Sequence, residues 1–272
     1  MQGWAVIRKG MNFTSPALRV LLGSHHSPTS DHRMRFLSRP LHVPLWLLLV
    51  AVAPAMADSR AQAEAPPLAA IGWLGHGTAP KAGTANCSGV LITPDIVITA
   101  DHCLTDGKTG HAADPAGLTF AAGLGGPTPA PLRHGKAIWL PAKDPLAPEG
   151  SILDYALGLL RLDRAISADE AAPMPLATTA PVAGTKVVMV GYPRTAPDRP
   201  ALQDDCRITL HDLPVIAMNC DAVSGFSGGA VLAQEGNRWV LTAILVAQAT
   251  NAANYGAIAR VPPPGVAQAL AP

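Results

Sequence analysis

Ser224-Gly225-Phe226-Ser227-Gly228-Gly229-Ala230 places a serine between glycines, ahead of the apolar residues Val231 and Leu232. Glycine on either side lets the backbone turn sharply, and nearby backbone N–H groups can then converge on a developing oxyanion. The same stretch also fits a glycine-rich hairpin loop. It therefore predicts either an exposed nucleophilic serine, Ser227, or a structural loop.

The order of residues along the chain narrows the choice. In the α/β-hydrolases, whose nucleophile turn is also G-x-S-x-G, the catalytic histidine follows the serine. The last histidine of this chain is His211, so no histidine after Ser227 can serve as the base. A base and an acid must therefore precede the serine, and the segment Thr99-Ala100-Asp101-His102-Cys103 supplies His102.

Three separate blocks of sequence occur in the order His, Asp, Ser. They are CSGVLITPDIVITADHC at residues 87–103, LDYALGLLRL at 153–162 and SGFSGGAVL at 224–232. These blocks resemble those of the trypsin/chymotrypsin-like serine protease family, and in particular its exported bacterial members similar to glutamyl endopeptidases. The resemblance implies an all-β fold of two packed antiparallel β-barrels, with the active site in the cleft between them.

The resemblance also assigns roles to residues. It implies that Ser227 is the nucleophile, that His102 is its general base, and that Asp154 orients the imidazole and stabilises the imidazolium. The backbone N–H groups of Gly225 and Ser227 would form the oxyanion hole. The implied reaction is hydrolysis of a protein or peptide substrate through an acyl-enzyme, with no metal and no cofactor. Without the resemblance, Asp154 would be interpreted as a turn residue at the start of an apolar strand.

Two residues depart from the family pattern near the site. Asp101 stands before His102, where the family usually has alanine, and we expect its side chain to point away from the imidazole. Phe226 stands where animal members have an aspartate that binds the ammonium of a newly released N-terminus. Because burying an ammonium against Phe226 would be costly, we expect local packing to order the oxyanion hole. Further along, Gly158 is expected to disturb the local strand geometry.

Substrate preference rests on three residues predicted to line the pocket: Asp221, Ala222 and Val246. Asp221 stands six residues before Ser227, where trypsin-like enzymes carry the aspartate that selects Arg or Lys. It also directly follows Cys220, as in glutamyl-endopeptidase-like members without that preference, so a structural and a selective role both remain open. A preference for glutamate is not supported, because Ala222 lacks a hydroxyl group.

The first 57 residues predict export. Met34, Arg35 and Arg39 precede an apolar core at residues 45–53, and Ala55-Met56-Ala57 fits a cleavage signal before Asp58. A membrane-spanning helix needs about 20 apolar residues, so we expect a signal peptide at about 34–57 and no stable membrane anchor after cleavage. The mature protein would be periplasmic or secreted. Met34 is a candidate start alongside Met1 and Met11.

All four cysteines follow the predicted signal, at positions 87, 103, 206 and 220. An even number of cysteines in an exported chain predicts two disulfides, but the spacing does not determine their pairing. The resemblance implies Cys87–Cys103, which leaves Cys206–Cys220. A zinc site is the alternative, although the chain has no C-x-x-C pair.

Composition favours short strands joined by turns: 4% of the residues are aromatic, and the chain has 25 Gly and 27 Pro. We expect a disordered lead-in at 58–67, a first barrel at 68–165 with His and Asp, and a second barrel at 180–265 with Ser. From Asp58 onward, 14 Lys and Arg oppose 18 Asp and Glu, which gives no case for nucleic acid. We expect a monomer. The alternative function is a non-catalytic trypsin-like binding module in the periplasm.

Overall fold

The computed structural model describes residues 65–141, 156–212, 214–248 and 256–270. The predicted signal segment, Asp58 and Asp154 lie outside these residues. The described part contains strands and short 3₁₀ helices. The 3₁₀ helices are η1 (Asp101–Cys103), η2 (Pro115–Gly117) and η4 (Val266–Leu270).

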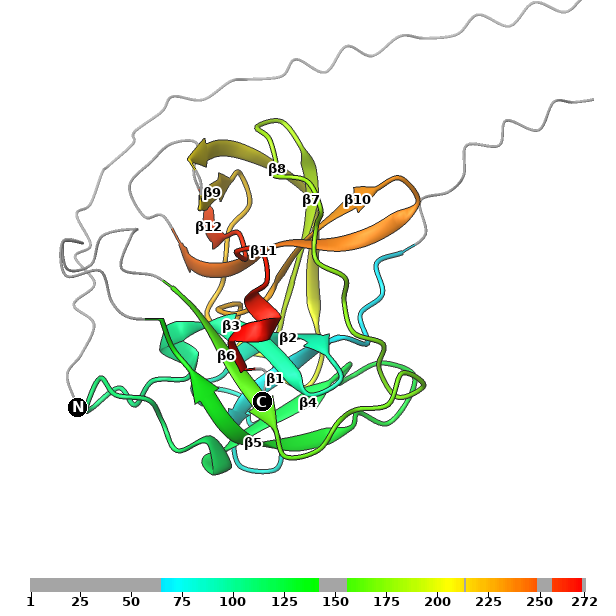
Figure 1. Ribbon diagram of the computed structural model, residues 1–272. Coiled ribbons are helices and arrows are strands. Elements are labelled where there is room, and N and C mark those ends of the chain that lie inside the picture. Colours follow the sequence, from blue (N-terminus) through cyan, green and yellow to red (C-terminus); the bar gives the residue numbers. More distant parts are fainter. Residues whose placement is uncertain (1–64, 142–155, 213, 249–255, 271–272) are drawn as a thin grey trace, which may run out of the picture. The chain divides into compact units, whose positions relative to one another are not determined.

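Twelve strands form two closed barrels (Figure 1). The first barrel has the strand order β1-β2-β3-β6-β5-β4 and the second has the order β10-β11-β12-β9-β8-β7, with antiparallel pairing of these strands. The predicted all-β fold of two barrels is therefore confirmed. The strands of the first barrel are β1 (Ile71–His76), β2 (Cys87–Thr93), β3 (Ile96–Ala100), β4 (Leu118–Ala122), β5 (Leu132–Trp139) and β6 (Leu157–Leu162). Those of the second are β7 (Lys186–Gly191), β8 (Ala201–Asp212), β9 (Val215–Met218), β10 (Ala230–Glu235), β11 (Arg238–Gln248) and β12 (Ala257–Arg260).

The β2–β3 hairpin carries the chain to His102. Its strands are rich in β-branched residues, which suit the pleated surface of a sheet, and all five residues of β3 are buried. The turn falls at Pro94 and Asp95, as the sequence predicts, and Val90 pairs with Ile98. Because β3 is buried and paired with β2 and β6, the position of η1 at the end of β3 is well defined.

The pairing of β3 with β6 differs from the expectation for Gly158. This glycine lies opposite Thr99 in an unbroken register that runs from Ile96–Arg161 to Ala100–Leu157. The expected disturbance is therefore wrong. The space beside Gly158 is taken by Leu104, whose Cδ1 lies 2.8 Å from where a Cβ would stand. The glycine serves close packing in a regular strand.

The segment between the barrels, residues 163–185, is called the connector here. An ion pair holds its first part to the first barrel: Nη2 of the buried Arg133 donates to both carboxylate oxygens of Glu170, at 3.0 and 2.9 Å. The backbone N–H of Ser167, the Arg133 guanidinium and the Ser167 hydroxyl together lower the pKa of Glu170 to about 2. The Glu170 carboxylate is thus a fixed acceptor at one end of the connector.

A second carboxylate holds the other part of the connector to the second barrel. Glu235, at the end of β10, accepts hydrogen bonds from the N–H and hydroxyl groups of Thr178 and Thr179, at 2.8 to 3.1 Å. The Thr178 hydroxyl, with the N–H and hydroxyl of Thr179, lowers the pKa of Glu235 to about 2. Each end of the connector is therefore attached to a different barrel.

The connector passes from the first barrel to the second between two consecutive residues, Met174 and Pro175. The N–H of Met174 donates to the carbonyl of Leu91 in β2, at 2.8 Å. The carbonyl of the next residue, Pro175, accepts from the N–H of Leu241 in β11, also at 2.8 Å. Met174 is buried in a core cluster that includes residues of both barrels. The barrels therefore meet directly along the connector.

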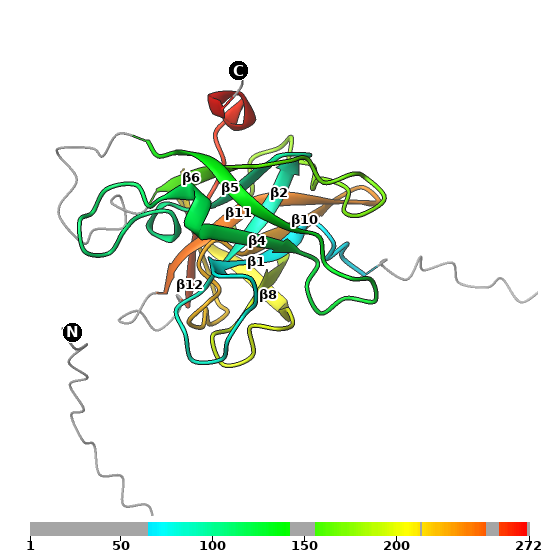
Figure 2. The same cartoon turned by 90° about the horizontal axis from the view of Figure 1, so that it is seen from below.

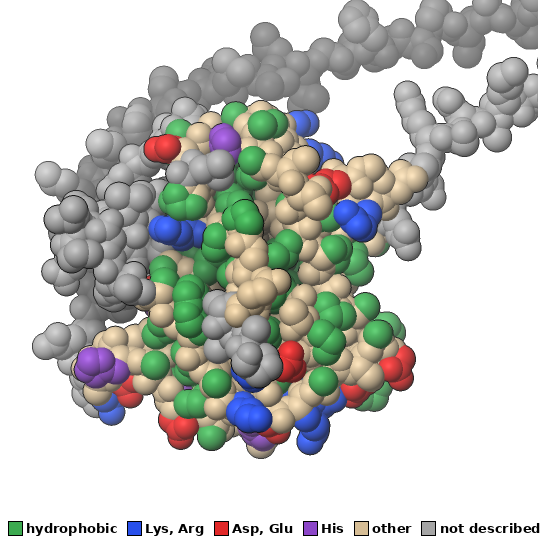
Figure 3. All heavy atoms as spheres, viewed as in Figure 1, with side chains coloured by type: hydrophobic (Ala, Val, Ile, Leu, Met, Phe, Trp, Pro, Cys, Tyr) green, Lys and Arg blue, Asp and Glu red, His purple; other side chains and the backbone are tan. Residues whose placement is uncertain are grey.

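Both predicted disulfides are present, Cys87–Cys103 and Cys206–Cys220. After β12 the chain continues to η4, drawn in red in Figures 1 and 2, and Val266 of η4 is buried in the core cluster shared by the barrels. The face drawn in Figure 3 intersperses acidic and basic side chains. Within the described residues, no helix has the length and apolar character needed to cross a membrane.

Candidate active site

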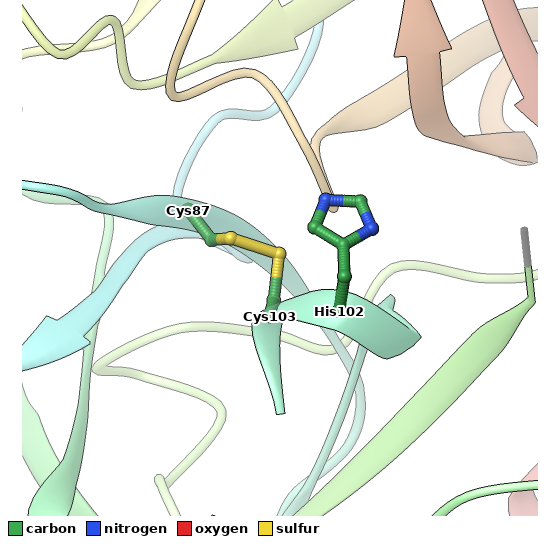
Figure 4. Close-up of side chains that lie close together, drawn as sticks. All are labelled: Cys87, His102 and Cys103. Atoms are coloured by element: carbon green, nitrogen blue, oxygen red, sulfur yellow. A yellow bond between two sulfur atoms is a disulfide. The ribbon is translucent and has the colours of Figure 1, made fainter. Parts of the chain in front are cut away.

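His102 lies in η1, immediately after β3. Its neighbour Cys103 is tied back to Cys87 on β2, so a disulfide anchors the turn that carries the imidazole. Figure 4 shows the ring standing up from η1 beside that disulfide. The side chain is 43% exposed, which leaves the imidazole accessible to an incoming group.

The side chain of Asp101 does not point away from the imidazole, so that expectation is wrong. Its Oδ1 accepts a hydrogen bond from the backbone N–H of His102 at 2.7 Å. The same oxygen lies 3.5 Å from Nδ1 of the His102 ring. The backbone contact turns the carboxylate towards the residue that follows it, and the ring is within reach.

Asp101 also faces the second barrel. Burial lowers the pKa of Arg260, at the end of β12, and the negative charge of Asp101 opposes that shift. The Asp101 side chain is 17% exposed, so this carboxylate is largely removed from solvent. Arg260 was not singled out from the sequence, because nothing in the spacing relates it to Asp101.

Asp154 lies outside the described residues, and the structure describes the chain again from Ala156. The carbonyl of Ala156 accepts a hydrogen bond from the N–H of Asp101 at 3.0 Å. Leu157 then pairs with Ala100. From Ala156 onward, the block predicted to carry the catalytic acid therefore runs alongside the segment that carries His102.

Ser227 is half-buried in the turn between Ser224 and β10, which we call the nucleophile loop (residues 224–229). Its backbone oxygen lies 3.7 Å from the Sγ atom of Cys103, so Ser227 lies beside the disulfide next to His102. Ser227 belongs to the second barrel and His102 to the first. The two predicted residues are thus brought together where the barrels meet.

The peptide groups of the nucleophile loop are held by hydrogen bonds. The carbonyls of residues 224 to 227 accept, in chain order, from Arg194 N, Ser88 Oγ, Gly229 N and Ser88 N, each at 2.8 Å. The N–H of Phe226 donates to Val223 at 3.0 Å and that of Gly228 to Leu245 at 2.7 Å. Within the described part of the chain, the N–H groups of Gly225 and Ser227 have no acceptor.

The unpaired N–H groups of Gly225 and Ser227 are the ones predicted for the oxyanion hole. The N–H of Ser224 also has no acceptor among the described residues, but Ser224 is exposed to solvent. In a planar trans peptide, the C=O and N–H point in opposite directions. Because the Ser224 carbonyl is held towards Arg194, the N–H of Gly225 is turned the other way. Gly225 has φ +101°, and a Cβ there would stand 2.7 Å from Arg194 N, so only glycine fits this turn.

The three predicted pocket residues differ in exposure. Asp221 is exposed, and its backbone oxygen accepts a hydrogen bond from Gln203 at 2.6 Å. Ala222 and Val246 are buried, at 8% and 2% exposure, and belong to different core clusters. Asp221 Oδ1 also lies 3.1 Å from where a Cβ on Gly256 would stand, so these two residues are neighbours.

One group of possible metal ligands occurs among the described residues: Cys87, His102 and Cys103, whose ligand atoms lie within 4.8 Å of one another (Figure 4). The two sulfur atoms are bonded to each other. A thiolate is the form of cysteine that binds a metal, and a disulfide offers none. This cluster therefore acts as the anchor of the His102 turn.

A residue that the sequence reasoning missed is Ser88, on β2. It is fully buried and supplies two of the hydrogen bonds to the nucleophile loop. Its position in the Cys87-Ser88-Gly89 triplet, next to the cysteine that anchors the His102 turn, could have drawn attention to it. A buried serine in an apolar strand needs hydrogen-bond partners, but the sequence does not indicate which residues they are.

Comparisons with known proteins agree with this geometry. A family described as "Trypsin-like peptidase domain" matches residues 87–241, more than half of the 272 residues. A solved structure described as "Structure of Glu endopeptidase in complex with MPD" is similar, with a TM-score of 0.56 and 17% identity over 74% of this chain and 88% of that chain. At that identity the similarity supports the fold. A comparison with curated protein sequences finds no match.

Proposed function

The chain belongs to the trypsin-like peptidase family, and from this we propose that it is an exported serine endopeptidase that forms an acyl-enzyme on Ser227. His102 takes the proton of the Ser227 hydroxyl as that oxygen attacks the scissile carbonyl, and later returns it to the leaving amine. Asp154 holds the tautomer of His102 and stabilises the imidazolium. Water then hydrolyses the acyl-enzyme by the same route.

The observation that carries this proposal is the pair of unpaired N–H groups at Gly225 and Ser227. Donors fixed before the reaction stabilise the tetrahedral oxyanion without reorganising, and such donors are a major contribution to acyl transfer. A loop with a purely structural role would be expected to satisfy these buried or half-buried groups. Here the N–H groups of Phe226, Gly228 and Gly229 are paired, whereas those of Gly225 and Ser227 are left for a ligand.

Substrate preference is part of the same proposal. The exposed carboxylate of Asp221 beside Gly256 supports a selective role for this residue, whereas the bond from Gln203 to its backbone supports a structural one. A set of peptides that differ only in the residue before the cleaved bond separates the two. Preference for Arg or Lys that is lost in Asp221→Asn supports selection, and an unchanged preference supports structure.

The central experiment is labelling with a fluorophosphonate, which reacts with activated serines. Folded wild-type protein is expected to be labelled at Ser227 and to hydrolyse fluorescein-labelled casein. Ser227→Ala and heat-unfolded wild type are the controls and are expected to do neither. If folded wild type is labelled no more than Ser227→Ala, the protein is not a serine peptidase, and a binding module on the same fold becomes the better hypothesis.

A further inference from the structure

Ser88 connects the two barrels at the nucleophile loop. It lies on β2 of the first barrel, directly after Cys87, and it is 0% exposed. Its hydroxyl accepts a hydrogen bond from the N–H of Tyr192, in the second barrel, at 2.8 Å. The same hydroxyl donates to the carbonyl of Gly225 at 2.8 Å. This hydroxyl therefore both donates and accepts a hydrogen bond across the interface between the two barrels.

The backbone of Ser88 makes a third contact with the second barrel. Its N–H donates to the carbonyl of Ser227 at 2.8 Å. Ser88 thus holds the carbonyls of Gly225 and Ser227. The Gly225 carbonyl belongs to the Gly225–Phe226 peptide, which lies between the two peptides that carry the N–H groups of Gly225 and Ser227. Holding this middle peptide therefore limits how far the two N–H groups on either side of it can rotate.

The position of Ser88 is itself determined by its own barrel. The Thr99 hydroxyl, on β3, donates to the Ser88 carbonyl at 2.7 Å. A Cβ on Gly228, where φ is +79°, would collide with both Thr99 Oγ1 and the Ser88 carbonyl. Thr99 lies three residues before His102. One short path of contacts therefore relates the imidazole segment to the nucleophile loop.

We propose that Ser88 is a positioning residue: its hydroxyl fixes the Gly225–Phe226 peptide, between the two oxyanion-hole donors, from the opposite barrel and so keeps the oxyanion hole in its reactive geometry. This inference rests on the proposed function of Ser227. It extends that function by assigning to the first barrel a part in shaping the hole. Removing the hydroxyl leaves the Tyr192 N–H and the Gly225 carbonyl buried without this partner, and the loop then gains freedom to turn.

The test compares Ser88→Ala with Tyr192→Phe in the full-length protein. The Tyr192 hydroxyl lies 2.9 Å from the carbonyl of Leu124 and 3.2 Å from that of Ile71, and its one proton is shared between them. Tyr192→Phe therefore removes a buried hydroxyl that joins the barrels without contacting the nucleophile loop. Active sites are counted with the fluorophosphonate, and p-nitrophenyl acetate is the substrate. Hydrogen exchange of peptides covering residues 221–230 is measured alongside, because it reports loop order whether or not the protein is active.

Ser88→Ala is expected to lower kcat per titrated site by about 10-fold or more, with little change in KM. This loss is smaller than the roughly 100- to 1,000-fold cost of deleting an oxyanion-hole donor. Exchange in residues 221–230 should rise in Ser88→Ala and stay at the wild-type level in Tyr192→Phe. Loss of thermal stability alone, with wild-type kcat and wild-type exchange in this segment, would overturn the inference. Absence of labelling in wild type would refute the proposed function, and the exchange comparison would still decide the role of Ser88.

Discussion

The Oδ1 atom of Asp101 lies 3.5 Å from Nδ1 of His102 and accepts the backbone N–H of the same histidine at 2.7 Å. A carboxylate other than the proposed Asp154 therefore adjoins the proposed general base. In the proposed mechanism, a negative charge at this distance would stabilise the imidazolium that forms when Ser227 is deprotonated. The two carboxylates differ in origin: Asp101 belongs to η1, whereas Asp154 precedes β6.

Asp101→Asn is expected to lower kcat by about fivefold, because one charge at this distance in a solvated site contributes on the order of 1 kcal/mol. The amide oxygen of asparagine can still accept the His102 N–H, so the turn should keep its shape. Steady-state kinetics with p-nitrophenyl acetate measure the effect. Asp154→Asn is the comparison and should cost more. If Asp101→Asn proves the more damaging change, Asp101 is the principal acid.

Glu170→Gln is expected to reduce the loss of unfolding free energy that acidification causes through the connector. The pKa of Glu170 is lowered from 4.5 to about 2, so its contribution to the free energy of unfolding is complete above pH 4.5 and is lost as the pH falls towards 2. The glutamine variant should be less stable at neutral pH and should lose less on acidification. Urea unfolding at neutral pH and within that window measures both quantities.

The control for this change is Asp169→Asn. Asp169 is exposed next to Glu170 and makes no hydrogen bond or ion pair within the described residues. Its substitution should leave the pH dependence of unfolding as in wild type. Equal effects of the two substitutions would show that the Arg133–Glu170 pair does not contribute to acid sensitivity.

Replacing Cys206 and Cys220 by serine is expected to lower the free energy of unfolding by about 3 kcal/mol, from the entropy of the short loop that the disulfide closes. Urea unfolding under non-reducing conditions gives the change. The same double replacement at Cys87 and Cys103 should cost a similar amount and should also reduce the rate per titrated site, because that disulfide anchors His102. Equal rates in both double variants would argue against this anchoring role.

Removal of an N-terminal tag is expected to leave activity unchanged. Phe226 is 1% exposed and belongs to the apolar core cluster of the second barrel, which also contains Cys206. We therefore expect packing around Phe226 to order the loop without a buried ammonium. Casein hydrolysis is compared between a chain starting at Asp58 and the same chain with an uncleavable tag. A tagged form that stays inactive until trimmed to a defined residue would require a docking site for the N-terminus.

The large features of the fold were predictable from sequence because they depend on patterns that are local or ordered. The β-branched runs on either side of Pro94 and Asp95 predict the hairpin before His102, and the order of three blocks predicts two barrels. The pairing Cys87–Cys103 followed from the same resemblance. The hairpin was inferred from a local sequence pattern, whereas the two barrels and the disulfide pairing were implied by the family resemblance that the three blocks carry.

The contacts that complete the site could not be predicted in the same way. Ser88 and Gly225 are 137 residues apart, and their hydrogen bond exists because two barrels are packed together. The orientation of Asp101 depends on a rotamer that a backbone N–H selects, so the expectation that it points away failed. Gly158 was expected to disturb its strand, whereas the strand is regular and the missing side chain leaves room for Leu104.

Only one peptide group, between Met174 and Pro175, separates the part of the connector bound to the first barrel from the part bound to the second. Met174 is bonded to β2 and Pro175 to β11, so neither barrel can swing on a flexible hinge at this point. His102 belongs to the first barrel and Ser227 to the second, so the hydrogen bonds on either side of this peptide and the shared core help to hold the two residues in place. If the protein is the proposed peptidase, we expect its substrate to adapt its own backbone to this fixed frame, which would favour extended, unstructured segments over folded ones.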